Sequence, residues 1–275
     1  MKFSVLQSVY HRDNPSFLSQ SLKSIAENTL MPEQVVLVKD GTLTPKLEAV
    51  ISEWESKLPL KVVGYEKNHG LAHALNYGLQ FLATELVARM DSDDICFPDR
   101  FEKQVLQFEK NNNLVILGTG IEEFYKNDEI NFHQIRLYPK LTTKKSIALY
   151  KGTPLAHPTV MLRTEILKKF KYSEETKCNE DIELWFRLLG AGYEIQTIQA
   201  PLLHFRITDG TFKRRSLSKA LNEYFIYFHN LLKFNGISKN HFYLLMRLFT
   251  RFLPSKLIKK LYFSSMRKNM FKESL

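Results

Sequence analysis

The sequence predicts an α/β fold in which a mostly parallel, mixed sheet is flanked by helices and followed by a basic, helical C-terminal appendage. Strand and helix patterns alternate over the first 125 residues, and repeated strand–helix–strand units form parallel sheets with helices on both faces. The charge then changes, because residues 206–275 carry 15 Lys and Arg against three Asp and Glu, whereas residues 1–205 carry 24 against 26. We therefore expect a near-neutral domain over 1–210, with halves of about 1–125 and 126–210, and a basic region over 211–275.

Length and composition exclude several classes of protein. The chain has 275 residues, of which 44% are hydrophobic and 25% charged, so intrinsic disorder is not expected. Two cysteines, Cys96 and Cys178, are too few for a disulfide framework and lack the spacing of a zinc site, which favours a reduced cytosolic compartment. The first residues, MKFSVLQSVY, are too polar for a signal peptide, and no apolar run reaches the length of a membrane-spanning helix.

Short apolar and β-branched runs predict the strands of the first half at 3–10, 34–39, 60–65, 85–90 and 114–118. Helices are expected between them. The first begins at Pro15 with Asn14 as its cap, and the third opens after Gly70 and runs over 71–82. The second and fourth are predicted over 47–54 and 101–108, where apolar residues recur at helical spacing.

The second half of the domain is less regular. It contains the stretch Lys151–Met161, a predicted helix over Glu180–Leu189 and a strand-rich stretch over 193–208. Three helical patterns follow in the tail, near 215–233, 241–253 and 255–270.

Polar residues fall directly after four of the predicted strands. Tyr10, Asp40, Asn68 and the stretch Asp91–Asp94 occupy these positions. In parallel α/β sheets, ligands bind outside the carboxyl ends of the strands. We therefore expect these residues to lie along one edge of the sheet, although they are far apart in the sequence.

The stretch Asp91-Ser92-Asp93-Asp94 is the sharpest local feature. Three carboxylates within four residues repel one another unless a cation lies among them. Mg²⁺ and Mn²⁺ take oxygen ligands and often bridge to substrate phosphates. The alternative is a solvated acidic turn, but the position after an apolar strand and before a proline-started helix gives a cation site equal weight.

Two other strand ends allow a structural or a functional interpretation. Asp40-Gly41 is a common turn pair. Asn68, next to His69 and Gly70, either caps the following helix or lies where a free helix N-terminus meets a phosphate. His69 and His73 are four residues apart, but the glutamate of the metalloprotease pattern is missing, so a metal is not expected there.

The predicted helix over Glu180–Leu189 begins with two carboxylates. Glu180 and Asp181 are favoured there by the helix dipole, and a carboxylate held at this point is also suited to act as a general base. Spacing alone leaves both interpretations open. For His157, Pro158 and Arg206 no local pattern decides the role.

The tail is amphipathic. Leu245, Phe249 and Phe252 recur at helical spacing, with Arg247 and Arg251 beside them. One interpretation is a helical hairpin packed on the domain, and the other is an interfacial helix on an anionic membrane. Nucleic-acid binding is the least favoured, because no recognised nucleic-acid motif is present.

These segments occur in an order that resembles the family 2 glycosyltransferases of bacteria, which have the Rossmann-like GT-A fold. The chain is similar to members that build surface polysaccharide, of the amylovoran-biosynthesis type. The resemblance covers about residues 3–210. It rests on the segments SVLQSVYHRDNPSFLSQSLKSI, VVLVKDG, NHGLAHALNYGL, ARMDSDD, AHPTVMLR and NEDIELWFRLLGAGY.

The resemblance implies a nucleotide site in the first half of the domain. Ser8 and Tyr10 match the loop that holds the base. Asp40 matches the acidic residue that recognises uracil, although many members have a second acidic residue where this chain has Lys39. Asp91 and Asp93 match the DxD motif, whose first residue usually meets the ribose and whose second binds the metal on the diphosphate.

The second half is implied to be the acceptor half. Asp181 matches the aspartate of the family's ED motif, the usual general base, with Glu180 beside it. His157 and Pro158 lie in the region that usually meets sugar or acceptor. Asn68 is expected with the nucleotide-binding residues.

The implied function is a metal-dependent, inverting glycosyltransferase that uses Mn²⁺ or Mg²⁺. It moves a sugar from a nucleotide-sugar, expected to be a UDP-sugar, to a lipid-linked or oligosaccharide acceptor in capsule, exopolysaccharide or lipopolysaccharide synthesis. Residues 241–270 are expected to hold it on the anionic inner face of the cytoplasmic membrane, and no nucleic-acid partner is expected.

Two alternatives belong to other classes. A nucleotidyltransferase acting on sugar phosphates commonly carries a glycine-rich loop after the first strand, but the segment here, VYHRDNPSF, has no glycine. A non-enzymatic membrane-surface binding protein would leave the carboxylates at the strand ends unexplained.

Overall fold

The structure, a computed structural model, describes residues 1–126, 130–176, 179–208, 210, 217–254, 257, 259, 262 and 263. Its strands are β1 (Phe3–Val9), β2 (Gln34–Asp40), β3 (Leu60–Tyr65), β4 (Leu86–Met90), β5 (Ile95–Cys96), β6 (Ile116–Lys126), β7 (Asn131–Arg136), β8 (Leu141–Thr142), β9 (Met161–Arg163) and β10 (Ile195–Arg206). Its helices are α1 (Pro15–Ala26), α2 (Pro45–Glu55), α3 (Leu71–Leu79), α4 (Arg100–Lys110), α5 (Ala148–Lys151), the 3₁₀ helix η1 (His157–Thr159), α6 (Thr164–Phe170), α7 (Glu180–Gly190), α9 (Leu217–Asn235) and α10 (His241–Arg251).

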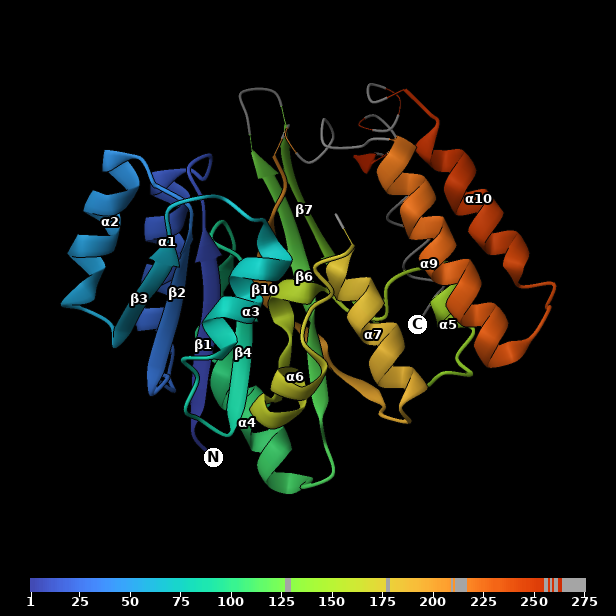
Figure 1. Ribbon diagram of the computed structural model, residues 1–275, viewed down its shortest axis with the longest axis horizontal. Coiled ribbons are helices and arrows are strands. Elements are labelled where there is room, and N and C mark those ends of the chain that lie inside the picture. Colours follow the sequence, from blue (N-terminus) through green and yellow to red (C-terminus); the bar gives the residue numbers. More distant parts are fainter. Residues whose placement is uncertain are drawn as a thin grey trace.

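One mixed sheet organises the domain (Figure 1). Its strand order is β3-β2-β1-β4-β9-β6-β10-β5, with β7 beside β6 and β8 beside β10. The strands β3, β2, β1 and β4 run parallel, as do β6 and β10, whereas β9 lies antiparallel between β4 and β6. The predicted α/β fold with a mostly parallel, mixed sheet is therefore confirmed.

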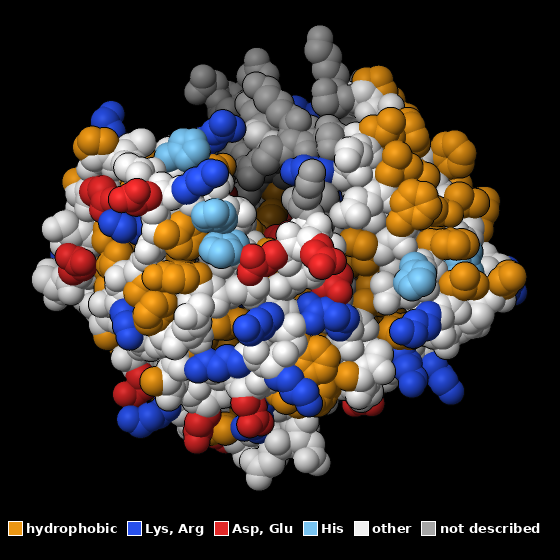
Figure 2. All heavy atoms as spheres, in the orientation of Figure 1, with side chains coloured by type: hydrophobic (Ala, Val, Ile, Leu, Met, Phe, Trp, Pro, Cys, Tyr) orange, Lys and Arg blue, Asp and Glu red, His pale blue; other side chains and the backbone are white. Residues whose placement is uncertain are grey.

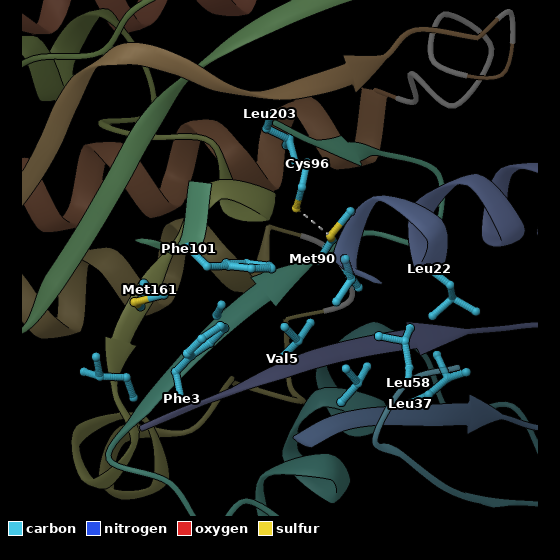
Figure 3. Packing of buried hydrophobic residues seen from close by; sticks show 14 of the residues in the cluster. Phe3, Val5, Leu22, Leu37, Leu58, Met90, Cys96, Phe101, Met161 and Leu203 are labelled. Carbon is cyan, nitrogen blue, oxygen red and sulfur yellow. Dashed lines mark hydrogen bonds between the residues drawn. The ribbon is translucent and has the colours of Figure 1, made fainter. Parts of the chain in front are cut away.

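Two apolar layers cover the two faces of the sheet, because neighbouring strand residues point to opposite sides. Val5 packs in the layer with α1, α2 and α4, and Leu6 packs in the layer with α3, α6, α7 and α9. Figure 3 shows the first layer, in which the rings of Phe3 and Phe101 lie 5.0 Å apart. Both faces are thus buried, as parallel sheets require.

The helix starts follow from local sequence. Asn14 caps α1 by accepting hydrogen bonds from the backbone N–H groups of Ser16 and Phe17, and Pro15 occupies the first turn. Both predictions are confirmed. At the end of β2, Gly41 has a φ of 89°, and a Cβ atom there would lie 2.8 Å from the backbone nitrogen of Asn68. Only glycine fits this turn, which brings the ends of β2 and β3 together.

The structure differs from the prediction beyond β4. The fifth predicted strand, over 114–118, is longer in the structure, where β6 runs from Ile116 to Lys126. A Cβ atom at Gly120 would lie 2.6 Å from the Leu137 side chain and 3.0 Å from the Ala200 carbonyl, so glycine allows close strand packing. The short strand β9 within the irregular region was not expected, and it joins the two halves of the sheet.

The helices α9 and α10 form an antiparallel pair that packs on α5 and α7 (Figure 1). Their inner face buries Ala220, Tyr227, Leu231 and Leu244, which agrees with one of the two interpretations of the tail, a helical hairpin packed on the domain. Arg247 and Arg251, which lie beside the apolar stripe of the tail, both bind the carboxylate of Glu223. Within the described residues, no helix is long and apolar enough to cross a bilayer.

The outer face of the hairpin is apolar, and Figure 2 shows hydrophobic side chains gathered over α9 and α10. Phe225, Phe242, Phe249 and Phe252 are between 56% and 66% exposed. The third predicted helix, near 255–270, lies mostly outside the described residues, as does Cys178. Of its few described residues, Tyr262 and Phe263 pack against Phe132 of β7.

Candidate active site

A pocket of about 300 Å³ opens at the carboxyl ends of β1, β2 and β4. It is lined by Ser8, Val9, Tyr10, Asp13, Asp40, Asn68, Gly70, Leu71, Asp91, Ser92 and Asp93. The structure thus brings together all six residues predicted to hold a nucleotide, as the sheet topology predicts. Asp13 and Ser92 were not predicted, and the hydroxyl of Ser92 donates to the Asp13 carboxylate at 2.8 Å.

The acidic turn Asp91–Asp94 is held from two sides. The carbonyl of Asp91 accepts hydrogen bonds from Gln7 of β1 and Ser21 of α1. From the far end of the chain, Arg206 donates from Nε to the Asp93 carbonyl at 2.7 Å, and its backbone N–H donates to Asp94 at 2.9 Å. The Arg206 guanidinium lies between the rings of Phe17 and Phe124. No local sequence pattern pointed to Arg206, because its partners are more than 100 residues away.

The three carboxylates of this turn face one another. One oxygen each of Asp91, Asp93 and Asp94 lie within 4.8 Å of the others. Asp94 is 1% exposed, and its burial, followed by the charges of Asp91 and Asp93, raises its pKa well above the usual range. Its Oδ2 has no hydrogen-bond partner within the described part of the chain. Converging carboxylate oxygens in need of positive charge fit a hard divalent cation such as Mn²⁺ or Mg²⁺.

Arg89 lies beneath this turn and was also missed by the sequence analysis. It interrupts the apolar strand β4, which was the available signal, and it is 2% exposed. Its Nη2 lies 2.5 Å from Oδ1 of Asp91. Burial lowers the pKa of an arginine and is the largest single influence here, but the charge and the hydrogen bond of Asp91, with the charges of Tyr172 and Asp94, together outweigh it and raise the pKa of Arg89.

The carboxylate of Asp40 is hydrogen-bonded to neighbouring groups of the protein. It accepts hydrogen bonds from the Tyr65 hydroxyl at 3.0 Å and from the Asn68 side chain at 2.8 Å. The backbone N–H groups of His69 and Gly70 donate to it as well, at 2.8 and 3.0 Å. Gly70 is the residue that precedes α3, and no side chain caps this helix, so the predicted cap at Asn68 or His69 is wrong. A phosphate at the start of α3 stays a prediction.

Asp40 thereby fixes the turn over 68–70 at the wall of the pocket, and a role in base recognition stays a prediction. Lys39, which stands where many members of the resembled family have an acidic residue, points to α2. Its Nζ lies 3.1 Å from the carboxylate of Glu48.

Asp181 lies in the first turn of α7 and is half-buried. Burial and the neighbouring charge of Glu180 raise its pKa to about 7, although the N–H of Ile182 and the charge of Arg89 oppose the shift. A carboxylate with this pKa takes a proton efficiently near neutral pH. Neither Asp181 nor Glu180 lines the pocket.

His157 and Pro158 lie in η1 and are buried. The Nε2 atom of His157 is 2.9 Å from the hydroxyl of Tyr172, and the Trp185 ring lies beyond it. Burial, together with the charge of Arg89, lowers the pKa of His157 well below its usual value, so it is neutral at pH 7. Neither residue lines the pocket, and their contact with sugar or acceptor stays a prediction.

Comparisons with known proteins agree with this geometry. Residues 4–170 match the model of a family described as "Glycosyl transferase family 2". The amylovoran biosynthesis glycosyltransferase AmsE of Erwinia amylovora is 34% identical over 94% of this chain and 97% of its own. The UDP-Gal:alpha-D-GlcNAc-diphosphoundecaprenol beta-1,3-galactosyltransferase of Escherichia coli is 36% identical over 92% of both. The crystal structure of S. aureus TarS 1–349 in complex with UDP-GlcNAc is 21% identical, with a TM-score of 0.65 over 91% of this chain and 72% of that one.

Proposed function

The chain belongs to glycosyl transferase family 2, and from that premise we propose that it transfers a sugar from a UDP-sugar to a lipid-linked glycan during assembly of a bacterial surface polysaccharide. In this proposal the reaction depends on Mn²⁺ or Mg²⁺ and inverts the configuration of the sugar. The nucleotidyltransferase and the non-enzymatic binding protein are set aside by the family membership.

One observation carries the proposal. Side chains from the ends of three parallel strands converge on a single pocket, and two of its carboxylates, Asp91 and Asp93, form a cluster with the buried Asp94. A nucleoside diphosphate needs an aromatic and polar wall for its base and a cation for its charge. Tyr10, Asp40 and Asn68 are suited to the first task, and Asp91 and Asp93 to the second.

In this proposal, the donor pocket and Asp181 have different tasks in the reaction. Asp93, together with Asp91, would hold a divalent cation, whose positive charge would neutralise the leaving diphosphate. Asp181, with its pKa of about 7, takes the proton of the acceptor hydroxyl as that oxygen attacks the anomeric carbon. A single base and a direct displacement give inversion.

Donor and acceptor are proposed from relatives of known name. The Escherichia coli relative, by its name, uses UDP-Gal and an α-D-GlcNAc-diphosphoundecaprenol. We take UDP-galactose and UDP-GlcNAc as first donors and GlcNAc-diphosphoundecaprenol as first acceptor. Release of UDP that depends on the acceptor supports transfer, whereas UDP release unchanged by any lipid-linked acceptor contradicts this class of acceptor.

A thermal-shift panel tests the donor site directly. We expect UDP with Mn²⁺ to raise the melting temperature, and we expect EDTA to abolish most of the rise, because a ligand that binds only the folded state stabilises it by mass action. A concentration of 100 times the Kd corresponds to about 2.7 kcal/mol. A rise with GDP or dTDP in place of UDP would keep the enzyme class and contradict the UDP assignment. No rise with any of the three would contradict the nucleotide site.

The tail is proposed to hold the enzyme at the inner face of the cytoplasmic membrane through residues 241–270. Its exposed phenylalanines form an apolar outer face, and the sequence from 224 to 272 contains ten Lys and Arg but no Asp or Glu. Two of the ten, Arg247 and Arg251, are paired with Glu223 inside the hairpin. Apolar contact is therefore expected to provide more of the binding than these two charges.

The double variant Phe249→Ser, Phe252→Ser tests the membrane contact. We expect binding to vesicles of three parts zwitterionic to one part anionic phospholipid to fall by about tenfold for each ring, since burying a phenylalanine contributes roughly 1.5–3 kcal/mol. Co-sedimentation with the vesicles measures it. Leu106→Ser on α4, which is 42% exposed on the domain, is the matched control. Equal binding by the double variant and the wild type would sink the proposal.

A further inference from the structure

Arg89 is a buried charged residue in β4, a strand whose other four residues are apolar. It alternates along β4 with Ala88 and Met90, which belong to the layer under α1 and α4, so its side chain points to the opposite layer under α3 and α7. Only Nη2 is paired, with Asp91. The Nε and Nη1 atoms have no hydrogen-bond partner within the residues that the structure describes.

A buried arginine with unpaired donors lowers the stability of the fold. Each buried donor without a partner costs about 1–3 kcal/mol, and a buried ion pair is often no more stable than an apolar replacement. Asp91, the partner, has a side chain that is one-third exposed at the pocket. Water therefore reaches Asp91 even without Arg89, so the pair is not explained by stability.

The surroundings of Arg89 connect the two ends of the site. On one side it holds Asp91, which lines the donor pocket. On the other side, the backbone N–H of Arg89 donates to the carbonyl of Val160, directly after η1, at 2.8 Å. In η1, His157 lies 2.9 Å from the hydroxyl of Tyr172, and its ring centroid is 6.0 Å from that of Trp185 in α7, the helix that begins with Glu180 and Asp181. In agreement with this placement, the charge of Arg89 lowers the pKa of His157 and opposes the rise in the pKa of Asp181. His157 is neutral, and burial keeps Tyr172 protonated, since it raises the pKa of the phenol. The fixed positive charge in this buried group is therefore that of Arg89.

We propose that Arg89 is a positioning residue for the transfer, whose guanidinium orients Asp91 toward the donor and provides one buried cation that acts on both Asp91 and Asp181. This inference rests on the proposed glycosyl transfer. In this inference, Arg89 keeps Asp91, at the donor pocket, and Asp181, the base, correctly placed relative to each other. No local motif of the sequence indicates this role.

The test compares Arg89→Met and Arg89→Lys with a matched control. Arg163→Met is suited, because Arg163 lies in β9 opposite Leu86, at the other end of β4 from the pocket. Its guanidinium binds the carbonyls of Asn112 and Leu114. Each variant is assayed for UDP binding with Mn²⁺ by calorimetry, for acceptor-dependent UDP release and for melting temperature.

We expect Arg89→Met to lose about 10- to 100-fold in kcat, as residues that orient a ligand-binding carboxylate do, and to bind UDP with Mn²⁺ more weakly, while its melting temperature stays at or above that of the wild type. Arg89→Lys, which keeps the charge, is expected to recover most of kcat and less of the UDP affinity, because an ammonium does not orient a carboxylate as a guanidinium does.

Two outcomes overturn the inference without touching the proposed function. In the first, an active wild type is matched by Arg89→Met in kcat and UDP affinity. In the second, Arg89→Met and Arg89→Lys both lose activity, and in each variant the loss is accompanied by a matching fall in melting temperature. That result would indicate a purely structural residue. A wild type that neither binds UDP nor releases it from a UDP-sugar would instead contradict the proposed function itself.

Discussion

Replacing Asp181 with Asn is expected to lower the rate of transfer by roughly 10²–10⁴-fold, the contribution of a positioned general base. The amide keeps the shape of the side chain but does not accept the proton of the acceptor hydroxyl. Because Asp181 does not line the donor pocket, binding of UDP with Mn²⁺ is expected to remain within a factor of about three of the wild type. Acceptor-dependent UDP release and calorimetry measure the two quantities.

The pH dependence of the wild type follows from the same carboxylate. Its pKa of about 7 in the folded protein means that the active, ionised form appears as the pH rises through 7. The rate at saturating substrates is therefore expected to rise tenfold per pH unit below 7 and to level off above it. Asp181→Asn is expected to lack this limb.

Stability changes in the opposite sense. The folded pKa lies above the unfolded value, so protonation of Asp181 stabilises the fold at low pH, and this contribution is lost as the pH rises through 7. At pH 8 the Asp181→Asn variant is thus expected to melt no lower than the wild type.

Glu183→Gln is the control on the same helix, since the Glu183 carboxylate pairs with Arg187 one turn away. It is expected to keep the rate and to lose at most about 0.5 kcal/mol of stability. Substantial transfer by Asp181→Asn, within tenfold of the wild type, would refute the assignment of Asp181 as the base.

Replacing Asp93 with Asn is expected to abolish the stabilisation by Mn²⁺ with UDP and to lower transfer by roughly 10³-fold, because charge neutralisation by a metal contributes several kcal/mol. The substitution removes one of the charges that raise the pKa of Asp94. The protein without ligands is therefore expected to be at least as stable as the wild type. Thermal shift with and without Mn²⁺ and UDP separates the two effects.

Asp99→Asn is the control for this change. Asp99 precedes α4, makes no side-chain cap and pairs with Lys103 at 2.5 Å, so its loss is not expected to alter metal-dependent binding. If Asp93→Asn retains the full Mn²⁺-dependent shift, the acidic turn is not the cation site.

The first half of the fold follows closely from the sequence. Strands β1 to β4 and helices α2 to α4 lie within three residues of their predicted ends, and α1 begins at the predicted Pro15, because each of these elements has a local pattern of apolar residues. The strand β9 was not predicted, because its three residues are too few for a periodic pattern. Its pairing with β4 and β6 also depends on residues far away in the sequence.

The residues of the site also differ in whether the sequence predicts them. Residues at strand ends, such as Asp40 and Asp91, were identifiable because topology alone places them at one edge. Arg206 was not, since its hydrogen bonds to Asp93 and Asp94 span more than 100 residues. The true partners of Asp40 and of Arg247 were equally hidden. A charged side chain in a sequence does not reveal whether it faces solvent, a ligand or an opposite charge on another element.

The long-range contacts of the acidic turn also set an order of events during synthesis of the chain. The strands β1, β2, β3 and β4 and all three carboxylates have been made by residue 94, but β6 joins them only through β9 at 161–163, and Arg206 arrives at the very end of β10. A nascent chain of 125 residues therefore carries the carboxylates of the turn and the residues that bind Asp91, but not Arg206, which binds Asp93 and Asp94. Since closing such distant contacts is slow, the donor site is expected to become competent for nucleotide in one late step, when β10 docks.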